Sequence, residues 1–231
     1  MNKYLLIIIL NVNELNAPIK RHRVAEWVRK QDPYACCLQE THLITKDPHK
    51  LKMKGWEKIF QANRQEKNPE VAILLSDQID FKTKTINRDK EGHYIILTVI
   101  IHQEAITLVN MYVPNIGTCN YVRKILEDFK KDIDSNILIV GYGYVNTPLS
   151  TVDRSSTQRI NKYIVALDNT LDQMDLTDIY RTFHTTEIKC TFFSNAHGAF
   201  SKIDHMVGHI TKSRNSRKLK SYQASSWIIM A

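Results

Sequence analysis

The stretch Cys36-Cys37-Leu38-Gln39-Glu40-Thr41-His42 begins with a short, mostly apolar run. This run ends at the carboxylate residue Glu40. It follows Gln31-Asp32-Pro33, which is typical of a turn, so the run predicts a buried strand over residues 35–39. Ligands collect where the strands of a covered sheet give way to loops, because polar side chains there project from a rigid base. Glu40 is therefore a candidate oxygen ligand for Mg²⁺, although an isolated glutamate at a strand end is more often a solvated acid.

A longer apolar run over residues 3–11 precedes this strand and predicts a first strand that is buried on both faces. Asn16 followed by Pro18 predicts the start of a helix, and strand, helix, strand at this spacing indicates an α/β fold. The apolar part spans seven residues and lacks a small-residue cleavage site, which argues against a signal peptide and a membrane span. We therefore expect a nuclear or cytoplasmic protein without a membrane partner.

Five extended runs follow without intervening helices, which indicates antiparallel strands stacked as two sheets. They cover residues 56–62, 71–75, 81–86, 94–101 and 105–112. Helices are predicted over 121–133 and 159–174, and further strands over 137–140, 191–194 and 203–207. No composition break divides residues 1–208, so the sequence predicts one α/β domain with helices outside two packed sheets.

Residues 209–231 depart from this pattern and form a basic, atypical C-terminal tail. The whole chain has 32 Lys and Arg against 24 Asp and Glu, and its net charge of +8 favours a polyanionic partner. The tail supplies five of these cations and no acid, so the charge of the body identifies no partner. The four cysteines form no Cys-x-x-Cys motif, which favours buried thiols over disulfides or zinc.

Polar side chains stand at the ends of several predicted strands, namely Asn11, Glu40 and Tyr112, and Asn146 lies in the loop after 137–140. Asp204 lies within an apolar segment, so it is either exposed at a sheet edge or buried for a function. Each has an ordinary structural explanation by itself, as a turn residue, a core aromatic or a solvated acid. Together they predict one pocket for magnesium and phosphate.

Five segments resemble the endonuclease domain of mammalian LINE-type retrotransposons, the N-terminal part of the reverse-transcriptase-bearing protein of the second open reading frame. They are Leu10-Asn11-Val12-Asn13, Gln39-Glu40-Thr41-His42, Asn110-Met111-Tyr112-Val113-Pro114-Asn115, Asn146-Thr147-Pro148-Leu149-Ser150 and Ser201-Lys202-Ile203-Asp204-His205. The resemblance covers roughly residues 1–208 and is specific to the retrotransposon branch of the endonuclease/exonuclease/phosphatase superfamily, to which that domain belongs. It implies a four-layer α-β-β-α sandwich, two mixed sheets flanked by helices.

The resemblance also implies an activity, which is metal-dependent nicking of double-stranded DNA by a monomer. The cofactor would be Mg²⁺, with Mn²⁺ as the alternative, held by Asn11 and Glu40. Tyr112 would contact the phosphate, Asn146 would orient the phosphate or the attacking water, and Asp204 would orient a catalytic histidine. The residues expected to touch DNA are Arg154, Thr191, Ser201 and Ile203.

Two departures from the family pattern remove groups that handle protons. The Gly-Asp-Phe-Asn motif is replaced by Gly141-Tyr142-Gly143-Tyr144-Val145-Asn146, which has no Asp, and a tyrosine with a pKa of about 10 is a poor base at neutral pH. The C-terminal Ser-Asp-His motif and its strand are replaced by Ser221 to Trp227, which contain no His. His205 follows Asp204 directly, so its side chain should point to the opposite face. We therefore expect weak or no nicking and a missing C-terminal strand.

Three alternatives stay open. The chain could be a non-catalytic nucleic-acid-binding remnant, whose affinity would fall steeply with salt while no strand is cut. It could lack a stable native state, because the lost last strand would expose a sheet edge. It could also hydrolyse phosphoinositides or sphingomyelin, an alternative that the retrotransposon-specific segments disfavour.

Overall fold

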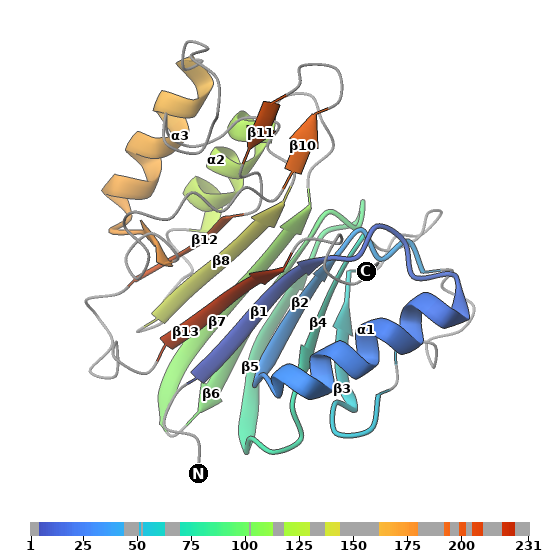
Figure 1. Ribbon diagram of the computed structural model, residues 1–231. Coiled ribbons are helices and arrows are strands. Elements are labelled where there is room, and N and C mark those ends of the chain that lie inside the picture. Colours follow the sequence, from blue (N-terminus) through green and yellow to red (C-terminus); the bar gives the residue numbers. More distant parts are fainter. Residues whose placement is uncertain are drawn as a thin grey trace.

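Two β-sheets face each other in the computed structural model, and helices cover their outer faces (Figure 1). The structure describes residues 5–43, 51, 53–62, 70–101, 103–112, 118–129, 137–143, 162–179, 192–194, 199–201, 205–209 and 219–224. None of the helices within these ranges has the length and apolar content needed to cross a membrane.

The first sheet has the strand order β13-β1-β2-β4-β3. Its strands are β1 (Leu5–Asn11), β2 (Ala35–Gln39), β3 (Lys58–Gln61), β4 (Val71–Leu75) and β13 (Leu219–Ala224). β1 pairs in parallel with β2 and β13, whereas β4 is antiparallel to β2 and β3. Helix α1 (Pro18–Gln31) begins at the predicted proline, but its N-cap is Ala17 and not Asn16, whose amide bonds Glu14 and the His42 carbonyl instead.

The second sheet has the order β5-β6-β7-β8-β12-β9. Its strands are β5 (Phe81–Arg88), β6 (Tyr94–Ile101), β7 (Glu104–Tyr112), β8 (Ile137–Gly143), β12 (His205–Gly208) and β9 (Thr177–Asp178). β7 and β8 are parallel, and the other pairs are antiparallel. The remaining elements are helices α2 (Thr118–Phe129) and α3 (Lys162–Gln173) and the antiparallel pair β10 (Phe192–Ser194) and β11 (Ala199–Ser201).

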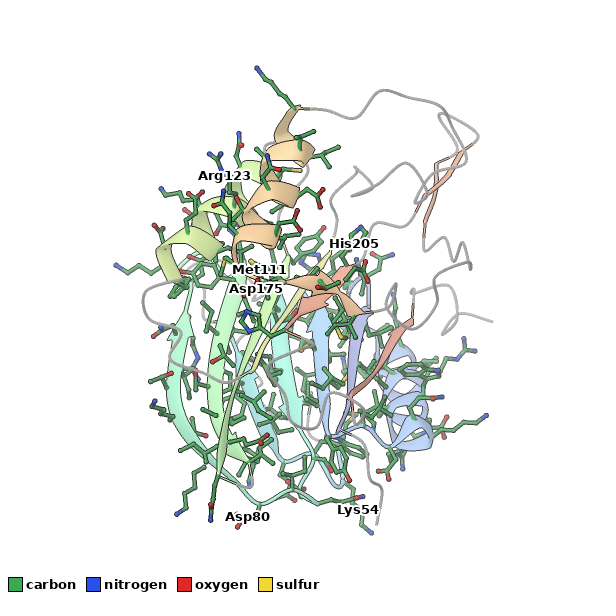
Figure 2. The ribbon with its side chains drawn as sticks, turned by 90° about the vertical axis from the view of Figure 1, so that its left-hand side faces the viewer. Lys54, Asp80, Met111, Arg123, Asp175 and His205 are labelled. Atoms are coloured by element: carbon green, nitrogen blue, oxygen red, sulfur yellow. The ribbon has the colours of Figure 1, made fainter. Side chains whose placement is uncertain are left out.

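Strand alternation divides the core into three layers of apolar side chains. Ile7 and Ile9 of β1 point between the sheets, while Ile8 and Leu10 pack under α1. On the other sheet, Met111 belongs to the layer beneath α2 and α3 (Figure 2). The order helix, sheet, sheet, helix confirms the predicted four-layer α/β sandwich.

β13 is the longest of three strands that the sequence did not predict; the others are β9 and β11. It lies in the segment expected to be an atypical tail, yet it pairs with β1 from Leu5↔Leu219 to Leu10↔Ala224. An edge strand needs partners for its backbone groups on one side only, so it can form from a segment with little apolar periodicity. The expectation of a missing C-terminal strand is therefore wrong, and β1 has neighbours on both sides among the described residues.

Candidate metal and phosphate site

The layer of side chains between the sheets turns polar at one end of the strands. β1, β2, β7 and β8 all point toward this end, so their carboxyl ends form one edge of the sandwich (Figure 1). The last inward-facing positions are Asn11 on β1, Gln39 on β2, and Asn110 and Tyr112 on β7. This edge is where the carboxyl ends of covered strands place ligand-binding groups.

Asn11 and Glu40 are joined directly at this edge. The parallel register pairs Asn11 with Gln39, the last residue of β2. Glu40, the residue that follows β2, therefore comes within reach of the Asn11 side chain. Asn11 Nδ2 donates to Glu40 Oε1 at 2.8 Å, and the Asn13 backbone N–H donates to Asn11 Oδ1 at 3.0 Å. Glu40 has a φ of +53°, a left-handed conformation that costs about 1–2 kcal/mol for a residue with a Cβ. The surrounding structure therefore holds this half-buried carboxylate in place.

A row of backbone hydrogen bonds connects the Glu40 loop to Tyr112. The N–H of Thr41 donates to the carbonyl of Glu70 at 3.1 Å, and the N–H of Glu70 donates to Gly92 at 3.3 Å. The N–H of Tyr112 then donates to the carbonyl of His93 at 2.8 Å. The Tyr112 side chain is half-buried and packs against the apolar layer between the sheets. Segments far apart in the sequence thus share one rigid edge.

Gln39 and Asn110 form a fully buried amide pair directly beneath this edge. Gln39 Nε2 donates to Asn110 Oδ1 at 3.1 Å and to the Met111 carbonyl at 3.0 Å. Asn110 Nδ2 donates to the carbonyls of Leu38 and Ala72, both at 2.9 Å. These bonds cross from one sheet to the other. Neither role was predicted from the sequence, although a polar residue at an inward-facing position of an apolar strand was the available signal.

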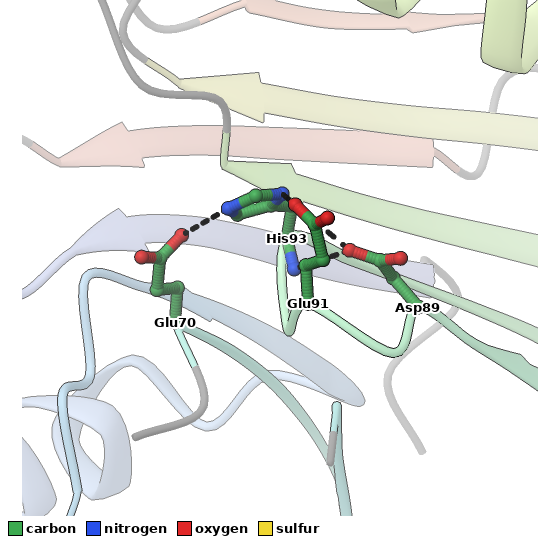
Figure 3. A network of polar contacts seen from close by, with 4 residues as sticks. All are labelled: Glu70, Asp89, Glu91 and His93. Carbon is green, nitrogen blue, oxygen red and sulfur yellow. Dashed lines mark hydrogen bonds and ion pairs between the residues drawn. The ribbon is translucent and has the colours of Figure 1, made fainter. Parts of the chain in front are cut away.

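His93 lies beside Tyr112 among three carboxylates (Figure 3). Its Nε2 is 3.6 Å from Glu70, and its Nδ1 is 3.5 Å from Asp89 and 3.5 Å from Glu91. The cluster fastens the β5–β6 turn to the start of β4. Burial, together with the nearby Asp89 carboxylate, raises the pKa of Tyr121, whose ring contacts His93 edge-on.

The two described histidines of the C-terminal part are held in the core. His205 is fully buried, and its Nδ1 lies 3.2 Å from Asp178 Oδ2 on β9. His209 is also buried, and its Nε2 lies 2.7 Å from the Met174 carbonyl oxygen, a hydrogen bond in which the ring nitrogen donates. Both imidazoles therefore have partners within the core.

The structure brings together three of the predicted site residues, namely Asn11 and Glu40 by a direct bond and Tyr112 on the same edge. β8 ends at Gly143 opposite Tyr112, and β12 begins at His205 opposite Tyr142. Ser201 is the last residue of β11. The remaining predicted residues lie outside the described ones; they are Asn146, Asp204, Arg154, Thr191 and Ile203.

The donors at this edge fit a hard cation. Glu40 has a carboxylate and Asn11 has an amide oxygen, which accepts from the Asn13 N–H; both are ligand types that Mg²⁺ takes, commonly one or two from the protein. Across the described ranges, no group of three or more His, Cys, Asp or Glu side chains is arranged to chelate a metal.

No protein-family model matches the sequence. Among solved structures, the AP endonuclease LMAP from Leishmania major is 15% identical with a TM-score of 0.70, and the match covers 89% of this chain and 79% of that one. An AP endonuclease from Archaeoglobus fulgidus is 18% identical with a TM-score of 0.66, covering 87% and 86%. The endonuclease domain of TRAS1, a telomere-specific non-LTR retrotransposon, is 14% identical with a TM-score of 0.63, covering 87% and 83%. The chain therefore has the same mixed α/β fold as these three endonuclease structures.

Proposed function

We propose that the chain is a LINE-type retrotransposon endonuclease domain that binds a divalent metal and DNA phosphate and cleaves DNA weakly or not at all. The observation that carries the proposal is the 2.8 Å bond between Asn11 and Glu40 at the carboxyl edge of the strands, next to Tyr112. The mammalian LINE type is supported by the five sequence segments named above.

In this proposal Glu40 and Asn11 hold Mg²⁺ or Mn²⁺, which would offset the charge of the scissile phosphate. Tyr112 contacts the phosphate, and Asn146 orients the phosphate or the water. Asp204 is assigned the position of the acid that orients the catalytic histidine in the family. The DNA contacts are assigned to Arg154, Thr191, Ser201 and Ile203. The double-stranded DNA target follows from the resemblance and agrees with a net charge of +8.

Weak cleavage follows from the groups that are missing. The Gly141 segment lacks the expected Asp, and its residues 141–143 continue β8 as strand. His205 and His209 are engaged in the core. Losing one general acid or base typically lowers a rate by about 10²–10⁴-fold, so the loss of two leaves little activity.

The test combines metal binding with a plasmid assay on the full chain. We expect the wild-type chain to bind Mn²⁺, detected by electron paramagnetic resonance, and the Glu40→Ala variant to lose this binding. Glu57→Ala is the matched control, because Glu57 is exposed and precedes β3 at the opposite end of the sheet, where Lys58 pairs with Leu75. Supercoiled plasmid should be nicked at least about 100-fold more slowly than by an active endonuclease of the same fold.

Two results would contradict the proposal. Equal Mn²⁺ binding by the wild type and Glu40→Ala would remove the metal site. Rapid Mg²⁺-dependent nicking that Glu40→Ala abolishes would show that the cleavage machinery is intact. Salt-sensitive DNA binding that is independent of Glu40 would favour a non-catalytic nucleic-acid-binding remnant instead.

A further inference from the structure

We infer that Asn110, acting through Gln39, is a positioning residue that sets the Glu40 carboxylate against Tyr112; the inference rests on the proposed function. Asn110 and Gln39 are both 0% exposed and do not reach the edge themselves. Any effect of Asn110 on metal or phosphate must therefore pass through the strands that it holds.

The position of the amide pair gives it this role. Asn110 precedes Tyr112 by two residues on β7, and its Nδ2 bonds the carbonyl of Leu38, which precedes Glu40 by two residues on β2. The same Nδ2 bonds Ala72 on β4, the strand that follows Glu70. The Asn110 side chain therefore connects β7, which carries Tyr112, to β2 and β4. Glu40 follows β2, and Glu70 of the His93 cluster precedes β4.

The apolar layer cannot provide this alignment by itself. Hydrophobic contacts are non-directional, so they fix the separation of the two sheets more strongly than their lateral offset. Hydrogen bonds are directional, and a buried amide or carbonyl left without its partner costs about 1–3 kcal/mol. The hydrogen bonds of Asn110 thus fix the lateral position of β7 relative to β2.

Gln39 depends on Asn110 for its placement. Its Oε1 is buried and has no hydrogen-bond partner among the described residues, so its side chain is held through Nε2, which bonds Asn110 Oδ1 and the Met111 carbonyl. Loss of Asn110 removes one of these bonds and also the side-chain donor that the Leu38 and Ala72 carbonyls share. Because misplacement by about 1 Å can lower activity about 100-fold, such a change should be felt at Glu40.

The test compares Asn110→Ala with Thr107→Val in the full chain. Thr107 is a buried residue of the same strand whose hydroxyl lies 3.0 Å from that of Thr98, so its loss destabilises β7 away from the edge. We expect Asn110→Ala to weaken Mn²⁺ binding by about 10–100-fold and Thr107→Val to change it by less than about twofold. Asn110→Ser, which keeps a donor, serves as the second variant if the alanine variant does not fold.

Backbone hydrogen exchange supplies a readout that needs no metal. The N–H of Val12 bonds the Gln39 carbonyl, and the N–H of Tyr112 bonds the His93 carbonyl. Asn110→Ala or Asn110→Ser should increase the exchange rate of these two N–H groups more than that of the Val99 N–H in the core. Unchanged Mn²⁺ affinity, or an equal loss in Thr107→Val, would overturn the inference. If the wild type binds no Mn²⁺, the proposed function fails, and exchange alone decides: a selective increase supports the positioning role and a uniform one overturns it.

Discussion

Backbone conformation at single residues is unusual around the Asn11–Glu40 bond. Asn13, Glu14, Glu40 and His42 all have positive φ values, of 42°, 73°, 53° and 44°. Non-glycine residues in this region are strained and persist where their surroundings hold them, often at functional sites. Here α1 helps, since Lys20 Nζ donates to the carbonyl of Asn13 at 2.5 Å. The carboxylate of Glu40 is thus placed by strained loops that a helix and a neighbouring strand secure.

The buried pair of His205 and Asp178 should serve stability and not the site. We expect Asp178→Ala to lower the free energy of unfolding by about 1.5–3 kcal/mol, because it removes a carboxylate that lies 3.2 Å from a fully buried ring nitrogen. Urea denaturation measures this change, and Asp178→Asn, which retains an acceptor, should lose less. A variant with wild-type stability but impaired Mn²⁺ binding would instead connect His205 to the site.

At the scale of elements, β8 and β1 approach each other closely between the sheets. A Cβ added at Gly141 would lie well within van der Waals distance of Ile9 Cδ1 and 3.0 Å from Ile9 Cγ1. Ile9 is buried and belongs to the inter-sheet core, so it has little room to move. The glycine that opens the altered Gly-Tyr-Gly segment therefore permits the contact of the two sheets next to the candidate site.

A double-mutant cycle tests this contact. Gly141→Ala should destabilise the chain by about 1–3 kcal/mol through overpacking. Ile9→Val removes the crowded Cδ1 at a cost of about 0.5–1.5 kcal/mol by itself, and in combination it should recover part of the loss. Denaturant midpoints of the four proteins give the coupling. Strict additivity would mean that the sheets adjust without involving Ile9.

Across the whole molecule, two buried thiols and two partly buried tyrosines have raised pKa values in the native state. Burial raises the pKa of the Cys37 thiol from 9.0 to about 12, and burial and the neighbouring Cys37 raise that of Cys36. Burial is also the main reason why the pKa values of Tyr94 and Tyr121 lie above the ordinary 10.0. All four shifts favour the neutral form in the folded chain.

Stability should therefore fall on the alkaline side. The contribution of these groups to the free energy of unfolding is fully present below pH 9, where the thiols are protonated in both the folded and the unfolded chain. It is lost as the pH rises from 9 toward 12, because the unfolded chain then releases thiol protons that the folded chain keeps. Urea midpoints at pH 8 and pH 10.5 measure the decline. A Cys36→Ala, Cys37→Ala double variant should show a shallower slope, and an identical slope would exclude the thiols as its cause.

Local patterns in the sequence were sufficient for the strands that are buried along their whole length. The apolar run over 71–75 matches β4, and the run before Glu40 matches β2, because burial on both faces demands an unbroken apolar segment. The run over 94–101 also matches β6, although that strand is only partly buried at four of its eight positions. The same patterns led to helices outside two packed sheets and to Asn11, Glu40 and Tyr112 as strand-end polar residues, whereas the four-layer class came from the family resemblance.

The sequence by itself determined that β2 and β4 are buried and where β1, β2 and β7 end, since these features follow from neighbouring residues along the chain. Only the tertiary structure decided which ends meet. The bond from Asn11 to Glu40 spans 29 positions, the bond from Gln39 to Asn110 spans 71, and β13 lies beside β1 from the other end of the chain. Such contacts are directional hydrogen bonds between segments that come together only when the strands and sheets pack. The local periodicity of the sequence therefore does not predict them.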